Sequence, residues 1–483
     1  MKLRLDAQLI KRSLAGHSWL GVMLGAFMYL LCLSGTLLVF ENAWVRWEQP
    51  GIAESATFNP ASLEPAYRQF IHGDGRGASY VYLALPGTGV PRVFLSSGEQ
   101  GRFVNEDGSL GPEVAHRWTD MLVDLHVYLH LPQTIGLLLV GITGALLCGL
   151  IVSGVLAHPR IFRDAFALRL RGSRHLAQAD IHNRLSVWSL PFQLCIAITG
   201  AYFGLAQPVD RVLASVFFHG DTQALRTRVF GDNPVLNQAV TPVPALQSAL
   251  QQVRTLAPGA TPMYITVEAA GTPRQSMLVG ARFPGRLIYA EQYSFDSAGH
   301  YLGKAGYSDG AAGRQAIYST YRLHFGNFGG WPVEVLYAVL GLAMTVVSVT
   351  GINIWLTRTQ RQGALQLGWI GFVWGTPAAL ALAAIAQLFL GLPPKPVLWI
   401  AIAAAIILAC LCREPRIAAR RLQLCGVASI GTLVIAHVAR FAAGPFPATA
   451  AGIDIVLAIT ALLFLLPALG SYTAATATPL AAP

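Results

Sequence analysis

The sequence has few charged residues and no cysteine framework, and both shortages narrow the classes of protein to which it can belong. Only 12% of the 483 residues are charged, about half the share found in soluble domains, which argues against an ordinary soluble globular protein. The six cysteines include no CxxC pair, and Cys410 and Cys412 form only a CxC. We therefore expect neither a disulfide framework nor a zinc module.

Nucleotide-binding and hydrolase motifs are also missing. The sequence contains no P-loop, no GxGxxG between a strand and a helix, and no serine nucleophile elbow. We therefore expect the chain to hold no nucleotide, NAD or FAD of its own, so that any reducing equivalents would come from a partner or from a membrane quinol.

What the sequence does have is long apolar runs. Eight of them are long enough, or nearly so, to cross a hydrocarbon core of about 30 Å. The first follows a basic N-terminus, as in a signal peptide, but it is too long for one and lacks a clear cleavage site, so we expect a retained helix. The expected transmembrane helices are at 17–40, 133–157, 185–206, 333–356, 367–391, 397–412, 423–442 and 452–470.

The basic residues are distributed unevenly along the chain. The net charge is +10, from 34 Lys and Arg against 24 Asp and Glu. The short loops after the second and sixth runs are rich in arginine, and the positive-inside rule places such loops, and with them both termini, in the cytoplasm. The long segments 42–116 and 207–322 then lie on the outer side. Because the membrane topology accounts for the positive charge, that charge gives no support for nucleic-acid binding.

An internal repeat relates the first four runs. In both copies a histidine and a Ser/Thr-Gly pair recur at matched spacings. The sets are His17 with Ser34-Gly35 (35 − 17 = 18), His182 with Thr199-Gly200 (200 − 182 = 18), His126 with Ser153-Gly154 (154 − 126 = 28) and His324 with Thr350-Gly351 (351 − 324 = 27).

The outer segments repeat as well. Residues 60–71 and 243–255 read as helices, and residues 103–111 and 293–303 each read as two strands around an acidic, Gly-containing turn. Each copy holds two spans and therefore inserts the same way up, which predicts a pseudo-two-fold axis along the membrane normal. We expect repeat 1 at 1–160, a basic cytoplasmic loop at 161–184, repeat 2 at 185–358 and a four-helix extension at 365–483.

The repeat arranges four histidines as two pairs. His17 and His182 are expected to begin outgoing helices near the cytoplasmic face, and His126 and His324 to begin returning helices near the outer face. Two neutral imidazoles that face each other in an apolar pocket suit bis-axial ligation of haem iron, and ionisable residues inside a membrane are usually functional. The sequence thus predicts two haems that form an electron route across the bilayer. The competing interpretation is four polar residues at the membrane interface.

Other residues are weaker candidates. His130 is a spare ligand, because Phe328 stands at its place in the second copy and no Glu completes a zincin helix with His126. His158 is expected to cap a helix or contact a haem propionate. Arg160 and Arg358 are expected to be snorkelling anchors or propionate partners. His437 is expected to be a packing or interface residue, and surface positions are expected for His72, His116, His175, His219 and His300.

Taken together, these motifs resemble the PepSY-associated transmembrane family. The resemblance covers about residues 10–358 and rests on the His-x-x-Leu-Gly at His17, the Leu-His at His126, the Asp-Ile-His at His182 and the Leu-His-Phe-Gly at His324. Residues 295–299 stand in the place of the family's Asp-x-x-Thr-Gly turn. The resemblance implies that the outer segments are small α+β PepSY-like periplasmic domains, that the membrane is a bacterial inner membrane, and that His17, His182, His126 and His324 are the haem-associated histidines.

The expected architecture is a mainly α-helical, polytopic membrane protein: a four-helix haem-binding bundle from two tandem repeats, two PepSY-like domains and four additional helices. The expected function is a di-haem b oxidoreductase that reduces a periplasmic ferric siderophore, with a quinol or a cytoplasmic flavoprotein as electron donor and membrane lipid around it. Two alternatives remain, a haem-free membrane-anchored binding or regulatory protein and a transporter.

Overall fold

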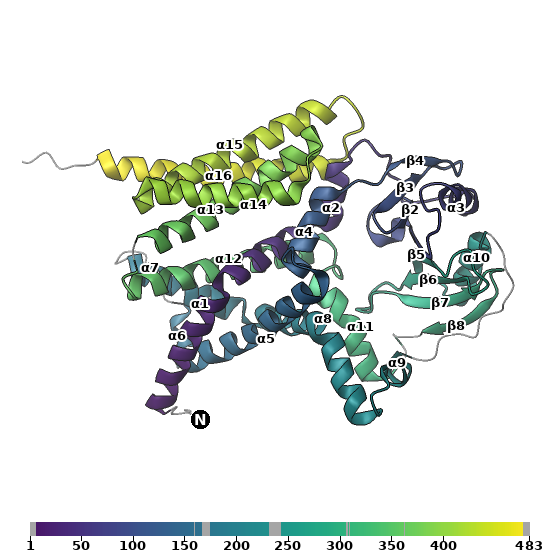
Figure 1. Ribbon diagram of the computed structural model, residues 1–483, viewed down its shortest axis with the longest axis horizontal. Coiled ribbons are helices and arrows are strands. Elements are labelled where there is room, and N and C mark those ends of the chain that lie inside the picture. The colour runs from purple at the N-terminus through teal and green to yellow at the C-terminus, as the bar shows by residue number, and fades with distance from the viewer. Residues whose placement is uncertain are drawn as a thin grey trace, which may run out of the picture. The chain divides into compact units, whose positions relative to one another are not determined.

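The chain forms two compact units, which are described separately. A computed structural model describes residues 6–158, 160–166, 174–230, 243–305, 308, 310–361 and 363–476. Residues 167–173 of the expected basic loop, including Arg169 and Arg171, lie outside these ranges. The helical unit comprises Met1–Gly51, His116–Gly204 and Glu334–Pro483, and the sheet unit comprises Ile52–Ala115 and Leu205–Val333 (Figure 1).

Eight helices in the described residues are long and apolar enough to cross a membrane, which confirms the eight expected spans. The chain is therefore a multi-pass membrane protein. Proline at the first turn and a capping Glu414, which accepts from the backbone N–H groups of Arg416 and Ile417, fix the start of α15. The eight helices are α1 (Ala7–Leu38), α5 (Gln133–Ala157), α8 (Leu190–Phe217), α12 (Trp331–Arg358), α13 (Ala364–Leu390), α14 (Pro394–Cys412), α15 (Pro415–Phe441) and α16 (Ala448–Thr476).

Shorter helices flank these spans, and three of the four candidate histidines lie in these shorter helices rather than in the spans. His17 lies inside α1 rather than at its start, and His182 lies in a separate helix ahead of α8. His126 and His324 lie in the last turns of short helices, not at the beginnings of α5 and α12, because positive φ angles at Leu129 and Gly326 end those helices first. The short helices are α2 (Glu41–Glu48), α4 (Arg117–Tyr128), α6 (Ile161–Asp164), α7 (Arg174–Trp188) and α11 (Ala312–Phe325).

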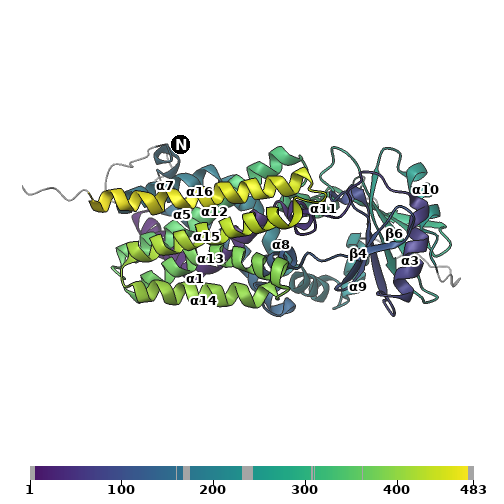
Figure 2. The ribbon, with the colours of Figure 1, turned by 90° about the horizontal axis from the view of Figure 1, so that it is seen from above.

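The C-terminal extension is a bundle of its own inside the helical unit. Figure 2 shows α13, α14, α15 and α16 running side by side, and α13 contacts both α14 and α15. Small residues permit the close approach of α13 to α14, since a Cβ on Gly371 would lie 2.6 Å from the Ile406 Cα. Small residues at such crossings are the usual means of packing helices in a membrane.

A buried polar network attaches this bundle to α2. His437 is fully buried, and its Nδ1 lies 3.0 Å from Asp454 Oδ2 while its Nε2 donates to the Trp47 carbonyl over 2.9 Å. The Trp47 Nε1 donates to Asp454 Oδ1 over 2.9 Å, and its ring stacks on His437 with ring centres 4.5 Å apart. His437 thus has the interface position expected from the sequence.

A second buried group lies nearby, where α2 meets α4. The Glu48 carboxylate accepts hydrogen bonds from the backbone N–H groups of Trp118 and Thr119 and from the Thr119 hydroxyl. Burial raises the pKa of Glu48 to about 7, although these hydrogen bonds and the charge of His116 act the other way. The pKa of Glu41 is raised by burial as well, against the charge of His116 and with that of Asp120.

These shifts predict that the helical unit is more stable in mild acid. A carboxyl whose folded-state pKa exceeds its unfolded value stabilises the fold below the unfolded value and loses that contribution as pH rises through the folded one. For Glu48 this window lies between about 4.5 and about 7. We expect the thermal midpoint of the full-length protein in detergent to fall across this range. The Glu48→Gln variant should show a flatter profile, and an equally steep one would contradict the assignment.

The sheet unit is built around one antiparallel sheet with the strand order β4-β3-β2-β1-β5-β6-β7-β8. The two outer segments, expected as two small domains, share this sheet because β1 pairs with β5, with Tyr82 opposite Thr266. The strands are β1 (Tyr80–Ala84), β2 (Phe94–Ser97), β3 (Gln100–Val104), β4 (Leu110–Glu113), β5 (Thr261–Glu268), β6 (Ser276–Arg282), β7 (Glu291–Asp296) and β8 (Tyr301–Ala305).

Two helices cover one face of the sheet. Alternation places Leu83 on β1 and Ile265 on β5 in a core with Phe70 and Leu250 from these helices. Both repeated helices and both strand–turn–strand motifs are confirmed by this arrangement. The helical segments of the sheet unit other than α11 are η1 (Pro60–Ser62), α3 (Leu63–His72), η2 (Pro86–Thr88), α9 (Thr222–Phe230) and α10 (Leu246–Leu256), with α3 and α10 on the core.

Candidate cofactor site

The structure brings His17 and His182 together inside the helical unit. Their ring centres are 6.3 Å apart and the ring planes are inclined by 80°. His17 comes from α1 and His182 from α7, and the internal repeat predicted that these two would form a pair. The two rings therefore lie next to each other, as the repeat predicted.

Each of these rings is held by the same local motif. The Nδ1 of His17 lies 3.0 Å from the Leu150 carbonyl and 3.3 Å from the Ser153 hydroxyl on α5. The Nδ1 of His182 lies 3.1 Å from the Val347 carbonyl and 3.2 Å from the Thr350 hydroxyl on α12. These partners stand at matched positions of the sequence repeat, so the two rings have the same kinds of hydrogen-bond partner.

These hydrogen bonds determine the tautomer of both imidazoles. A carbonyl oxygen only accepts, so Nδ1 must carry the proton that it donates, and Nε2 then keeps its lone pair. All hydrogen bonds of the two side chains within the described residues run through Nδ1. A backbone carbonyl on the other ring nitrogen is the usual way of orienting a metal-binding histidine.

The spacing of the two rings fits one metal ion between them. Two imidazoles bound on opposite sides of one ion, with bonds of about 2.0–2.1 Å and roughly 1.1 Å from each nitrogen to its ring centre, have ring centres about 6.2–6.4 Å apart. The observed 6.3 Å falls in this range. The described residues contain no group of three His, Cys, Asp or Glu side chains suited to a bare ion. Among the described residues the pair could thus supply two ligands to an ion.

A cavity adjoins the two histidines. It has a volume of about 320 Å³ and is bounded mainly by apolar and small side chains of α1, α5, α7 and α12, a size within the usual range for small-molecule sites. Arg358 and His158, two of the weaker candidates, line it, and so does Asn183, which the sequence did not single out. Arg160 is exposed and is not among the lining residues.

His126 has surroundings that match those of His17 and His182. Its Nδ1 lies 3.0 Å from the Leu31 carbonyl and 3.2 Å from the Ser34 hydroxyl, both on α1. His324 lies in the sheet unit, on α11, and its ring centre is 5.7 Å from that of Phe325. His126 belongs to the helical unit and His324 to the sheet unit.

His130 differs from these histidines because both of its ring nitrogens have partners. Its Nε2 lies 2.8 Å from the Met121 carbonyl, and its Nδ1 accepts from the Trp399 Nε1 over 2.9 Å. No lone pair remains for a metal in this arrangement. The residue instead joins α4 to α14 of the extension.

The Ser/Thr-Gly pairs have a role that the sequence only partly indicated. They were expected to permit close helix packing and to make room for a porphyrin. In the structure the glycines make room for imidazoles, since a Cβ on Gly35 would lie 2.7 Å from His126 Cε1, and one on Gly154 would lie 3.1 Å from His17 Cε1. The paired hydroxyls are the hydrogen-bond partners of Nδ1. The signal in the sequence was that each pair recurs with one histidine.

The contact between Gly154 and the His17 ring predicts that valine substitutions at two glycines of α5 will differ strongly in their effect on stability. The Gly154→Val variant should push the His17 ring out of place and destabilise the protein by about 1–3 kcal/mol, as overpacking does. The matched control Gly149→Val lies on the same helix, where an added Cβ meets no atom within 4 Å. Thermal unfolding in detergent compares the two variants, and equal midpoints would contradict the assignment of Gly154.

The sequence is similar to a known protein family and to a bacterial relative. The family described as the PepSY-associated TM region matches residues 14–358, which include both copies of the repeat. The chain is also 27% identical over 296 residues to an uncharacterized protein of Pseudomonas aeruginosa, covering 57% of this chain and 73% of the relative. The match ends at Arg358, so the four helices of the extension lie outside the family region.

Proposed function

The chain belongs to the family of the PepSY-associated TM region, and from this premise we propose that it is a di-haem b electron-transfer protein that reduces ferric siderophores. It would lie in the bacterial inner membrane with both termini in the cytoplasm and the sheet unit in the periplasm. The observation that carries the proposal is the pair of imidazoles of His17 and His182, whose ring centres are 6.3 Å apart beside an apolar cavity.

The residues of this site have separable roles. His17 and His182 would hold the iron through their Nε2 lone pairs, and the carbonyls of Leu150 and Val347 keep the rings in the tautomer that leaves those lone pairs available. Arg358 at the cavity is a cation suited to a propionate. The apolar lining excludes water and favours a flat, hydrophobic group. When bound, haem iron supplies reversible one-electron transfer between its ferrous and ferric states.

A second haem is proposed from the repeat. His126 is held by a carbonyl and a hydroxyl in the same way as His17 and His182, and His324 is its sequence equivalent in the second copy. We assign these two histidines to an outer haem, which would complete a route from one face of the membrane to the other. This assignment rests on the sequence repeat and on the surroundings of His126.

In the proposed reaction one quinol supplies the electrons for two ferric chelates. A quinol gives up two electrons and releases two protons, and each electron reduces one Fe(III) chelate to Fe(II) on the outer side. The resulting Fe(II) is held far less tightly by hard oxygen ligands, because its charge is lower, and it leaves the chelate. A cytoplasmic flavoprotein is the alternative donor. The absence of nucleotide motifs in the sequence supports an external donor in either case.

The function is tested by reduction of iron across a membrane. Liposomes that contain the full-length protein and a reduced quinol should convert an external ferric chelate to Fe(II), measured as the coloured complex of an Fe(II)-specific chelator. The control His72→Ala changes an exposed histidine of α3 and should keep the full rate. A haem-free protein that still binds extracytoplasmic partners would favour the regulatory alternative. Haem-independent uptake of a solute would favour a transporter.

A further inference from the structure

A row of aromatic rings crosses the face of the sheet opposite to α3 and α10. Tyr82 on β1 and Tyr264 on β5 have ring centres 5.7 Å apart, and Tyr289, before β7, follows at 6.4 Å. Beyond Tyr82 the row continues through Phe94 at 6.3 Å. All of these residues belong to the sheet unit, and all except Tyr264 are partly exposed.

The row also continues onto α11. Tyr321 lies 4.4 Å from Tyr289, Phe325 stacks on Tyr321 at 4.3 Å, and the ring of His324 is 5.7 Å from that of Phe325, each distance joining ring centres. The aromatic row therefore ends at one of the histidines assigned to the outer haem. Successive rings in van der Waals contact give a short path between that histidine and anything bound on the sheet.

The geometry of the row suits a flat aromatic ligand. The planes of Tyr82 and Tyr264 differ by 28°, and those of Tyr264 and Tyr289 by 19°, so three rings share nearly one orientation. Tyr264 lies flat across β6, because a Cβ on Gly280 would come within 2.3 Å of its ring. Offset stacking of parallel rings is a favourable arrangement, so an aryl ligand would extend it.

Two arginines, Arg282 and Arg322, lie near each other at the α11 end of the row. Arg322 is buried, and its guanidinium donates to the carbonyls of Arg286 and Asn327. Burial and, after it, the charge of Arg282 lower the pKa of Arg322, while Tyr289 acts the other way. Among the described residues neither Arg282 nor Arg322 forms an ion pair with a carboxylate. Within the described ranges the charge of Arg322 is therefore compensated by carbonyl dipoles alone, and an anion bound at this end of the row would be stabilised by both arginines.

That anion is distinct from the propionates of a haem on His324. Residues two apart in an α-helix point about 200° apart around its axis, so Arg322 and His324 lie on opposite sides of α11. Arg322 faces the segment with Arg286 and Tyr289. The arginines thus serve a ligand on the sheet and not the group bound to the histidine.

We propose that this face, formed by Tyr82, Tyr264, Tyr289, Arg282 and Arg322, is the docking site for a ferric chelate that is both aryl and anionic, a ferric catecholate. This inference rests on the proposed function and adds the substrate class to it. The partly exposed Tyr82 and Tyr289 stack on the catechol rings while the buried Tyr264 between them keeps their planes nearly parallel, and the arginines neutralise the negative charge of the complex. A ferric trihydroxamate offers neither feature, since it is neutral and aliphatic.

Binding to the full-length protein in detergent tests the proposal without any electron transfer. Calorimetry would compare the trianionic complex of Fe(III) with three 2,3-dihydroxybenzoate-amide ligands against a neutral ferric trihydroxamate. We expect the catecholate to bind at least about tenfold more tightly. Tyr289→Leu should weaken it by about three- to tenfold, and Arg282→Gln, at a partly exposed residue, by about tenfold.

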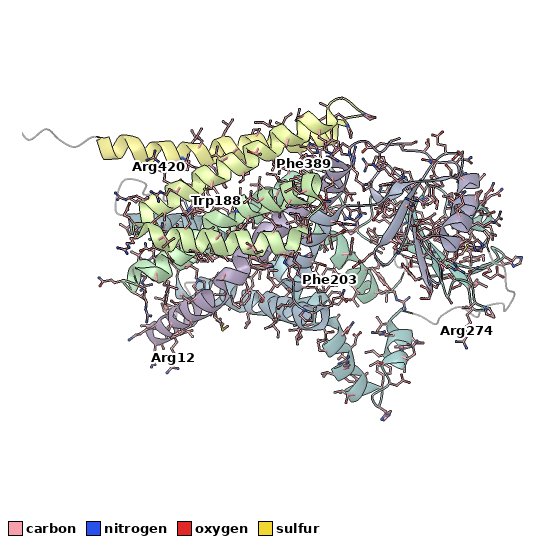
Figure 3. The ribbon with its side chains drawn as sticks, turned by 45° about the horizontal axis from the view of Figure 1, so that its top comes forward. Arg12, Trp188, Phe203, Arg274, Phe389 and Arg420 are labelled. Carbon is pink, nitrogen blue, oxygen red and sulfur yellow. The ribbon has the colours of Figure 1, made fainter. Side chains whose placement is uncertain are left out.

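Matched controls separate binding from folding. Arg274→Gln removes the same charge from the turn at the other end of β6, where Arg274 is exposed (Figure 3), and Tyr301→Leu removes a tyrosine of β8. Neither should change binding. Equal affinity for the two chelates, or equal losses in the control variants, would overturn the docking site. Loss of the haem spectrum with intact catecholate binding would instead overturn the proposed function alone.

Discussion

The His182→Ala variant should lose the inner haem while it keeps the outer one. The imidazole of His182 is one of two that face each other across 6.3 Å, so its removal leaves the iron with one protein ligand in an apolar cavity. The haem content of the purified protein, measured as the pyridine haemochrome, should fall from two per chain to about one. Reduction of ferric chelates should fall by at least about 10²-fold, since the loss of a residue that only orients a metal ligand already costs about 10–100-fold.

Three further variants serve as comparisons for His182→Ala. His17→Ala should give the same content and rate as His182→Ala, because we assign both residues to the same iron. His130→Ala should keep both haems, since both nitrogens of His130 already have protein partners, and His72→Ala should be unchanged. Two haems retained in both His17→Ala and His182→Ala would contradict the pairing of these histidines.

The His437→Leu variant should show the largest loss of stability. It removes one of the two partners of the buried Asp454 carboxylate, the other being the Trp47 indole N–H, and leaves the Trp47 carbonyl without its donor. Breaking a buried pair on one side costs about 3–5 kcal/mol. Thermal unfolding in detergent should therefore show a large drop in the midpoint, with the C-terminal bundle detached from α2.

The double variant His437→Leu with Asp454→Leu provides the internal control. Replacing both partners removes the unpaired carboxylate, and apolar replacements of a buried pair are often close to neutral. We expect the double variant to recover part of the midpoint lost in His437→Leu, since the unpaired carboxylate is gone while the indole N–H and the carbonyl of Trp47 stay without their partners. If it is as unstable as the single variant, the loss comes from packing around the His437 ring and not from the pair.

The membrane architecture could be predicted because hydropathy and the internal repeat are local signals. Runs of apolar residues fixed the eight spans to within a few residues at most ends, and the repeat of His17 at His182 predicted that two distant helices would share a site. The repeated helix and strand–turn–strand motifs of the outer segments were predicted in the same way. Each of these features depends on spacing along the chain, which a sequence displays directly.

Features that depend on long-range pairing could not be predicted. The joining of the two outer segments through β1 and β5 is set by contact between strands far apart in sequence, so each segment alone suggested a separate domain. The partners of His130 likewise come from Met121 and from Trp399 in the extension. The Ser/Thr-Gly pairs were recognised, but only the structure shows that they hold imidazoles.

The absorption spectrum of the purified full-length protein, oxidised and then reduced with dithionite, tests the central claim most directly. The account predicts a Soret band and, on reduction, the sharp α and β bands of low-spin haem b with two imidazole ligands, at a content of two per chain. The His182→Ala protein should lose about half of that signal. A wild-type protein purified from haem-replete cells without these bands would contradict the account.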